Sequence, residues 1–108
     1  MEQREVNAIV RSEVLERVEK RLSELRVKGL NVTHVKGYGE YKNFFSRSWF
    51  VQYARIQIYT EKSRASEIAQ AIIESGHTGA PGDGIVAILP VENIFRIRSK
   101  AEAKIDEI

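Results

Sequence analysis

The 108-residue sequence contains no cysteine, only two histidines and a formal net charge of +2. The absence of cysteine excludes disulfides and thiolate metal sites. The small net charge does not predict a nucleic-acid partner. No apolar run approaches the length of about 20 residues that spans a membrane, and the polar start, residues 1–5, is not typical of a signal peptide. We therefore expect a cytoplasmic protein with a single domain over residues 1–108, long enough to bury a core.

The residues that indicate a binding site are concentrated late in the chain. Four glycines and a proline fall within residues 76–84, which we call the glycine loop. Glycine at this density allows unusual backbone conformations or the close approach of a ligand. Downstream, Arg96 and Arg98 are spaced by two, so they would share one face of an extended segment. Together these features predict an anion or phosphate cradle. The alternative is an ordinary helix-to-strand loop followed by a solvated basic edge.

The periodicity of apolar residues predicts two helices among several strands. The inward stripe of the second helix would consist of Ala65, Ile68, Ala69 and Ile72, and Ala54, Ile56 and Ile58 would share one face of the strand over residues 49–60. Ser12 would cap the first helix and Gly29 would follow its C-terminal end, while Gly76 would end the second helix, which begins near Ser63. The final residues, 101–108, would form a frayed tail or a short helix. The expected strands cover residues 6–10, 30–38, 49–60, 85–89 and 94–98, with a loop over 40–48.

This order, strand-helix-strand-strand-helix-strand, is the pattern of the α+β ferredoxin-like fold, with both helices on one face of an antiparallel sheet and a short extra C-terminal strand. The strand Ile85–Leu89 is apolar on both faces, which a half-solvated strand would not be. Another copy of the chain is the simplest partner to cover the open sheet face.

Several separated motifs resemble those of the nitrogen-regulatory PII family, in the same order along the chain. The glycine loop and the Arg96-Ile97-Arg98 segment resemble the family's C-terminal signature. The stretches 31–39 and 8–11 resemble its second and first strands. The resemblance implies a homotrimeric signal-transduction protein of nitrogen regulation, not an enzyme. The family's T-loop, which corresponds to about residues 40–48 here, would regulate a partner protein such as a membrane transporter or a metabolic enzyme.

The resemblance also implies an adenine nucleotide bound in clefts between subunits, with residues from several parts of the chain. Gly37 and Gly39 would line the cleft at the base of the T-loop. Gly82 and Gly84 would offer main-chain N–H groups to phosphate, and Asp83 between them would belong to the same nucleotide-binding site. The guanidinium groups of Arg96 and Arg98 would also bind phosphate. Ile9, Asn31 and Tyr59 would contact the base.

Three departures from the family pattern bear on the ligand. Ile85 stands where PII proteins carry a phosphate-binding lysine. Glu40 and Tyr41 stand where a glutamine helps to hold magnesium and 2-oxoglutarate, which puts both ligands in doubt. The T-loop is shorter and lacks the uridylylation segment. Losing one charged contact of ~1–3 kcal/mol weakens a phosphate-rich ligand by roughly ten- to a hundredfold. We therefore expect ADP, AMP or a cyclic form rather than ATP.

Other functions fit only parts of the sequence. The CutA family is a ferredoxin-like trimer linked to metal tolerance, but it has no reason to carry this series of glycines and arginines. A PII-fold protein that has lost nucleotide binding is a second alternative. The acylphosphatases place an arginine on a phosphate loop; Arg11 follows the first strand, yet no cradle surrounds it in the sequence. His34 and His77 are the only histidines, and a lone histidine in a strand is more often a packing or surface residue than a metal ligand. An aromatic cluster near the T-loop, including Trp49, serves either packing or docking.

Overall fold

The computed structural model describes residues 2–37 and 51–104. The predicted loop at 40–48, its aromatic cluster and Gly39 therefore lie outside the described residues. The elements are β1 (Gln3–Arg11), a short 3-10 helix η1 (Ser12–Val14), α1 (Leu15–Glu24), β2 (Asn31–Gly37), β3 (Val51–Glu61), α2 (Lys62–Gly76), β4 (Gly84–Val91), β5 (Phe95–Arg96) and β6 (Ala101–Glu102).

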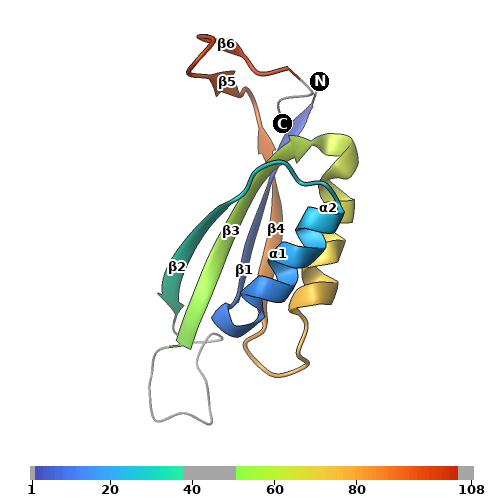
Figure 1. Cartoon of the computed structure of the whole chain (residues 1–108), viewed down its shortest axis with the longest axis vertical. Helices are drawn as coiled ribbons and strands as arrows, with labels where there is room; N and C mark the ends of the chain where they lie inside the picture. Colours follow the sequence, from blue (N-terminus) through green and yellow to red (C-terminus); the bar gives the residue numbers. More distant parts are fainter. Residues whose placement is uncertain (1, 38–50, 105–108) are drawn as a thin grey trace.

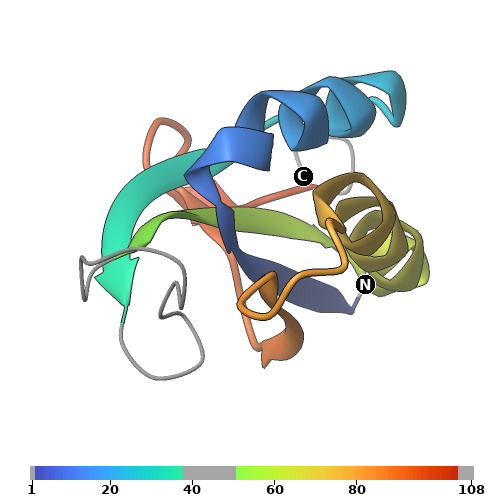
Figure 2. The same ribbon diagram turned by 90° about the horizontal axis from the view of Figure 1, so that it is seen from below.

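The main sheet has four strands in the order β2-β3-β1-β4, and every neighbouring pair is antiparallel. Both helices lie on one side of this sheet, as the front and end-on views agree (Figures 1 and 2). The predicted ferredoxin-like α+β fold is confirmed. Its topology places the end of β1 beside the start of β4, and this juxtaposition determines where the glycine loop sits.

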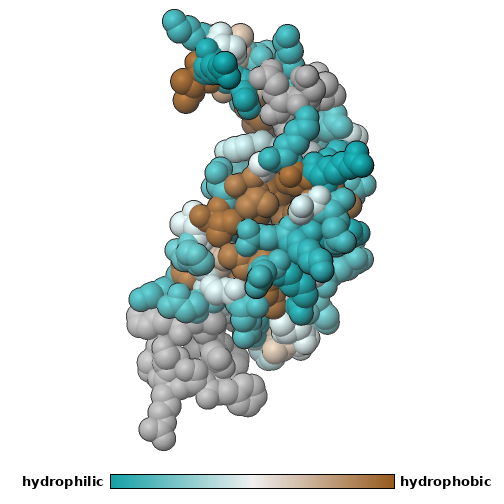
Figure 3. All heavy atoms as spheres, viewed as in Figure 1, coloured by the Kyte–Doolittle hydropathy of each residue, from teal (hydrophilic) through white to brown (hydrophobic). Residues whose placement is uncertain are grey.

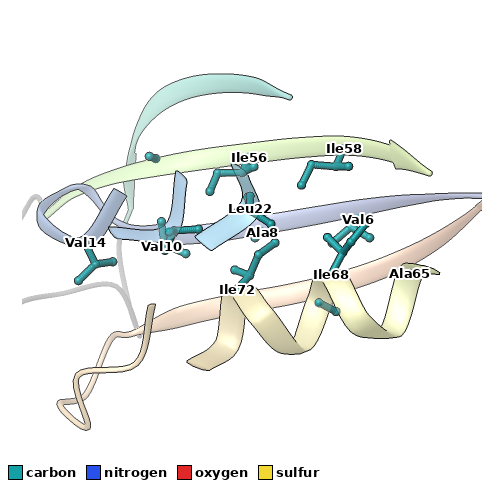
Figure 4. Packing of buried hydrophobic residues seen from close by; sticks show 13 residues of the cluster. Val6, Ala8, Val10, Val14, Leu22, Ile56, Ile58, Ala65, Ile68 and Ile72 are labelled. Carbon is teal, nitrogen blue, oxygen red and sulfur yellow. The ribbon is translucent and has the colours of Figure 1, made fainter. Parts of the chain in front are cut away.

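The core lies between the helices and the sheet (Figure 4). Alternate residues of β1 and β3 point into it because successive strand side chains face opposite sides. The predicted stripe of α2 is confirmed, since all its members are buried. The buried residues from these elements include Val6, Ala8, Val10, Ala54, Ile56, Ile58, Ala65, Ile68, Ala69 and Ile72, with Val18 and Leu22 from α1.

Both predicted ends of the first helix are wrong. Arg11 precedes η1 without a side-chain cap, and the hydroxyl of Ser12 is buried with no hydrogen-bond partner among the described residues. At the other end Arg26, not Gly29, takes the left-handed conformation, with φ of 60°. The N–H of Val27 donates to Leu22 O (3.1 Å) and that of Arg26 to Ser23 O (3.0 Å). These two bonds form a Schellman motif, and Val27 packs against the core, so packing ends the helix before the glycine.

We predict that Arg26→Gly raises stability. Arginine at this left-handed position carries a steric penalty of about 1 kcal/mol that glycine avoids. The free energy of unfolding, measured in urea, should rise by about 0.5–1 kcal/mol. Ser23→Gly is the matched control: that residue lies inside α1, so the same substitution should lower stability by about the same amount. A loss of stability in Arg26→Gly would contradict the motif.

Each helix supplies an arginine to the C-terminal end of the other. Arg64 of α2 donates to Leu25 O (2.6 Å), at the end of α1. Arg17 of α1 donates to Ser75 O (2.5 Å) and His77 O (3.2 Å), at the end of α2. Cations bonded to terminal carbonyls satisfy their acceptors and oppose the helix dipole. Arg17 thereby also holds the residues from which the glycine loop departs.

The C-terminal segment folds as a hairpin that projects beyond the end of the main sheet (Figure 1). β5 and β6 pair, and residues 97–100 form the turn, in which the N–H of Lys100 donates to Arg96 O (2.9 Å). Arg98 is therefore a turn residue, and the prediction that it shares an extended face with Arg96 is wrong. The expected tail or helix over 101–108 is also wrong where described, because Ala101–Glu102 is a strand.

Candidate functional site

The glycine loop joins α2 to β4 at one end of the main sheet. Three of its glycines have positive φ: Gly79 and Gly82 at 87° and Gly84 at 106°. Such values exclude most other residues. Gly84 also begins β4 close against β1, so that a Cβ placed on it would lie 1.8 Å from Ile9 O. These positions need glycine for backbone reasons, whatever the loop binds.

The carboxylate of Asp83 folds this loop onto itself. It accepts the N–H groups of Thr78 and Gly79, each at 2.9 Å, and the Thr78 hydroxyl. It also accepts Arg11 Nε at 3.2 Å. Burial raises the pKa of Asp83, but the hydrogen bonds from Thr78 and Gly79, together with Arg11, outweigh it and hold this pKa well below its usual value. The carboxylate is therefore ionised.

Two side chains from the main sheet hold the middle of the loop. Arg11, at the end of β1, also donates through Nη2 to Pro81 O. Tyr53, buried and paired with Arg11 across β1 and β3, donates its hydroxyl to Gly82 O at 2.7 Å. We call Arg11, Tyr53, Thr78 and Asp83 the loop anchor. Because its members come from β1, β3 and the loop, the main sheet itself sets the loop's position.

An open pocket of about 120 Å³ lies beside the loop, between the ends of β1, α2 and β4. Its lining includes Ile9, His77, Asp83, Gly84 and Ile85. Sites for drug-sized ligands usually have about 300–1,000 Å³. As lined by the described residues of one chain, this pocket is therefore too small to enclose a nucleotide.

The predicted site residues fall into two groups. Ile9, Gly82, Asp83 and Gly84 come together at the loop end of the sheet, and Gly37 ends β2 at the same end, paired with Val51. The other predicted residues lie further from the loop: Asn31 at the start of β2, Tyr59 near the end of β3, and Arg96 and Arg98 in the hairpin.

The hairpin arginines and the glycine loop lie at opposite ends of β4 (Figure 1). The eight residues of β4 span about 23 Å at the usual rise of a strand. A single chain therefore does not bring Arg96 or Arg98 to the glycine loop. Any ligand that contacts both must be bound by two chains.

β4 is an edge strand with exposed apolar side chains. Ile85 (48% exposed) and Leu89 point to the open face, opposite the helices, and Ile88 points to the helix side, in register with Val6. Brown apolar surface also appears on the projecting hairpin (Figure 3), where Ile97 is 96% exposed. The apolar character of both faces of this strand was predicted, and the structure places it at an unpaired edge of the described sheet.

The rest of the open face carries polar side chains. Glu5 accepts hydrogen bonds from Asn7 (2.8 Å) and Gln57 (3.2 Å) there. The apolar surface available to a partner is therefore concentrated along β4 and the hairpin rather than spread over the whole sheet.

Within the described ranges, no group of three or more potential ligands could hold a metal ion. His34 lies exposed on β2 and His77 lies exposed at the start of the glycine loop. The same part of the chain contains no helix with the length and apolar character needed to cross a membrane.

Comparison with known proteins decides the family. The family model described as nitrogen regulatory protein P-II matches residues 3–101. The chain belongs to the P-II family. This P-II chain is therefore a regulatory signalling protein of a family that is not enzymatic, and the family match favours P-II over the CutA alternative.

Individual relatives agree with this. The nitrogen regulatory protein P-II of Azospirillum brasilense is 31% identical over 103 residues, covering 89% of this chain and 92% of the relative. The P-II protein of Microchaete diplosiphon gives the same identity and coverage. The crystal structure of Arabidopsis thaliana PII bound to citrate superposes with a TM-score of 0.81 at 30% identity, covering 95% of this P-II chain and 90% of the other.

Of the loop anchor, only Asp83 was among the residues predicted for the site, and the contributions of Arg11 and Tyr53 were not predicted. Arg11 seemed to have no cradle, yet it lies directly against the glycine loop. The signal that could have found it is the fold itself, because β1 pairs with β4 and its last residue must lie beside the loop before β4. Tyr53 required the register of β1 with β3, which no local pattern supplies.

Proposed function

We propose that this P-II chain forms a homotrimer that binds an adenine nucleotide in clefts between subunits and regulates a partner protein through its T-loop. The observation that carries the proposal is the separation of the glycine loop from the hairpin arginines within one chain. A cleft between two chains unites the glycine loop of one with Arg96 and Arg98 of another.

The surface for this assembly is the β4 edge together with the hairpin. Exposed apolar side chains gather there, and burying them against a second copy supplies the driving force for association. The unpaired edge of β4 would also be protected from unwanted strand pairing. In a closed trimer, each subunit would form one such interface with each of its neighbours.

In the proposed cleft, Gly37, Gly39, Gly82 and Gly84 let the ligand approach the main chain. Arg96 and Arg98 bind phosphate, and Ile9, Asn31 and Tyr59 contact the base. Ile85 is exposed beside Gly84, where it offers no charge to a phosphate. ADP, AMP or a cyclic adenine nucleotide is therefore favoured over ATP.

Light scattering combined with calorimetry tests this proposal. The expected mass at micromolar concentration is three times the 12.3 kDa of one chain. Titration with AMP, ADP, ATP, cyclic AMP and cyclic di-AMP should show binding to the trimer, with ATP not the tightest. A stable monomer would contradict a nucleotide site between subunits. A trimer that binds none of these ligands would instead support a P-II protein that has lost nucleotide binding.

Replacing Ile85 by lysine should shift the nucleotide preference. We expect Ile85→Lys to tighten ATP more than AMP, by roughly tenfold, because only the longer phosphate chain reaches the new ammonium. The half-exposed position lets a lysine stem lie along the surface with its head in water. Calorimetry at two salt concentrations measures the effect, which should shrink as salt rises.

Ile88→Lys is the matched control, because Ile88 is similarly exposed on β4 but faces the other side of the sheet. Because β4 also belongs to the proposed subunit interface, light scattering must first show that both variants remain trimeric. In the trimer, Ile88→Lys should not change the ratio of ATP to AMP affinity. Equal tightening of both nucleotides by Ile85→Lys would contradict the position assigned to this side chain.

A further inference from the structure

We infer that Arg11, Tyr53 and Asp83 are positioning residues that aim the N–H groups of Gly82 and Asp83 at a bound phosphate, while the Asp83 carboxylate itself does not touch the ligand. This inference deepens the proposed function and rests on it. It is carried by the hydrogen bonds of the loop anchor.

The first step concerns the direction of two peptide groups. In a trans peptide the C=O and the N–H point to opposite sides. Arg11 holds Pro81 O toward the body of the protein, and Tyr53 does the same to Gly82 O. The N–H groups in those two peptides, belonging to Gly82 and Asp83, therefore point away from the body.

The second step concerns what these N–H groups bind. Within the described part of the chain, neither of them donates to a protein acceptor. Two adjacent N–H groups around a residue of positive φ, here Gly82, form the kind of concave nest that binds anions. A phosphate oxygen is an acceptor of suitable size and charge for such a pair.

The third step concerns the Asp83 carboxylate. Both of its oxygens are already used: one accepts from Arg11 and the Thr78 hydroxyl, and the other from the N–H groups of Thr78 and Gly79. A carboxylate facing a phosphate would repel it. Asp83 instead faces the loop, where it closes the turn that carries the nest.

The direction in which Asp83→Asn changes the affinity for ADP distinguishes a positioning role of the carboxylate from direct contact with the phosphate. If Asp83 positions the loop, Asp83→Asn should weaken ADP at least tenfold, because an amide cannot accept all four hydrogen bonds. If the carboxylate faced the phosphate, the same change would remove a like charge and tighten ADP. Calorimetry should be run both in EDTA and with Mg²⁺. Weakening seen only with Mg²⁺ would mean that the carboxylate holds a metal, and would overturn the inference.

Tyr53→Phe tests the peptide direction with the removal of one hydroxyl. The expected result is ADP binding weakened by about tenfold, together with only a small fall in the melting temperature of the ligand-free protein, because the Gly82 carbonyl loses its donor while the core packing of the ring is kept. Arg21→Gln is the control: it removes a charge from α1 that has no contact with the loop, and should leave ADP binding unchanged. Unchanged ADP affinity in Tyr53→Phe overturns the role given to Tyr53.

Amide NMR of the full chain with inorganic pyrophosphate distinguishes this inference from the proposed function. The Gly82 and Asp83 amide protons should shift in the wild type, and much less in Tyr53→Phe. Such shifts without any nucleotide binding would refute the proposed function and leave the nest supported. The absence of shifts at both amides in the wild type would overturn the inference even if a nucleotide bound elsewhere.

Discussion

Gly84→Ala is expected to lower the free energy of unfolding by about 3 kcal/mol or more. Two effects add at this position. The φ of 106° is strained for any residue with a Cβ, which costs on the order of 1–3 kcal/mol. The new Cβ would also lie 1.8 Å from Ile9 O, so β1 and β4 would have to separate. A loss of this size falls in the upper range for single substitutions.

Urea unfolding of the variant measures this loss directly. Gly29→Ala is the matched control, because a Cβ on Gly29 meets no atom within 4 Å and its φ is not in the left-handed region. That change should be neutral or slightly stabilising, since alanine restricts the unfolded chain. Similar effects of the two substitutions would contradict the close approach of β4 to β1.

The second large effect is on ligand binding. Arg98→Ala is expected to weaken ADP by about 1.5–3 kcal/mol, or roughly ten- to a hundredfold, because a hydrogen-bonded charge contact is lost. In a single chain Arg98 is exposed in the hairpin turn, with no ion-pair partner among the described residues. Melting of the ligand-free protein should therefore change little.

Calorimetry and thermal melting of the same preparation separate the two roles that Arg98 could have. Lys20→Ala is the control, because it removes the same charge from an exposed position on α1. A large fall in ligand-free stability or in trimer mass, with unchanged ADP affinity, would assign Arg98 to a subunit contact instead of a phosphate contact.

Local pattern was sufficient for the fold. The inward stripe of α2, with members such as Ile68 and Ile72, and the alternation of Ala54, Ile56 and Ile58 in β3 predicted which faces would be buried. The order of these periods then predicted the ferredoxin-like arrangement. Both patterns can be read without tertiary information, because the residues of a buried face recur along the sequence with the period of the helix or strand.

Local pattern failed where two conformations compete within a few residues. The first helix could continue toward Gly29, yet it ends at Glu24, because Val27 packs against the core and Arg26 takes the left-handed conformation despite its strain. The alternation of apolar and basic residues around Arg96 and Arg98 is typical of a strand. Residues 97–100 instead form a turn, because β5 pairs with β6 and closes a hairpin. Such choices depend on contacts that no short window contains.

The sequence by itself determined the class of the fold, the buried faces and the glycine-rich character of the loop, because each depends on residue type and spacing along the chain. Only the tertiary structure decided how that loop is held. Arg11 and Tyr53 lie about 30 to 70 residues from Gly82 and Asp83 along the chain, and their hydrogen bonds exist because the antiparallel register of β1, β3 and β4 brings them to one end of the sheet. The same topology places the hairpin arginines at the other end, so that the proposed phosphate site needs a second chain.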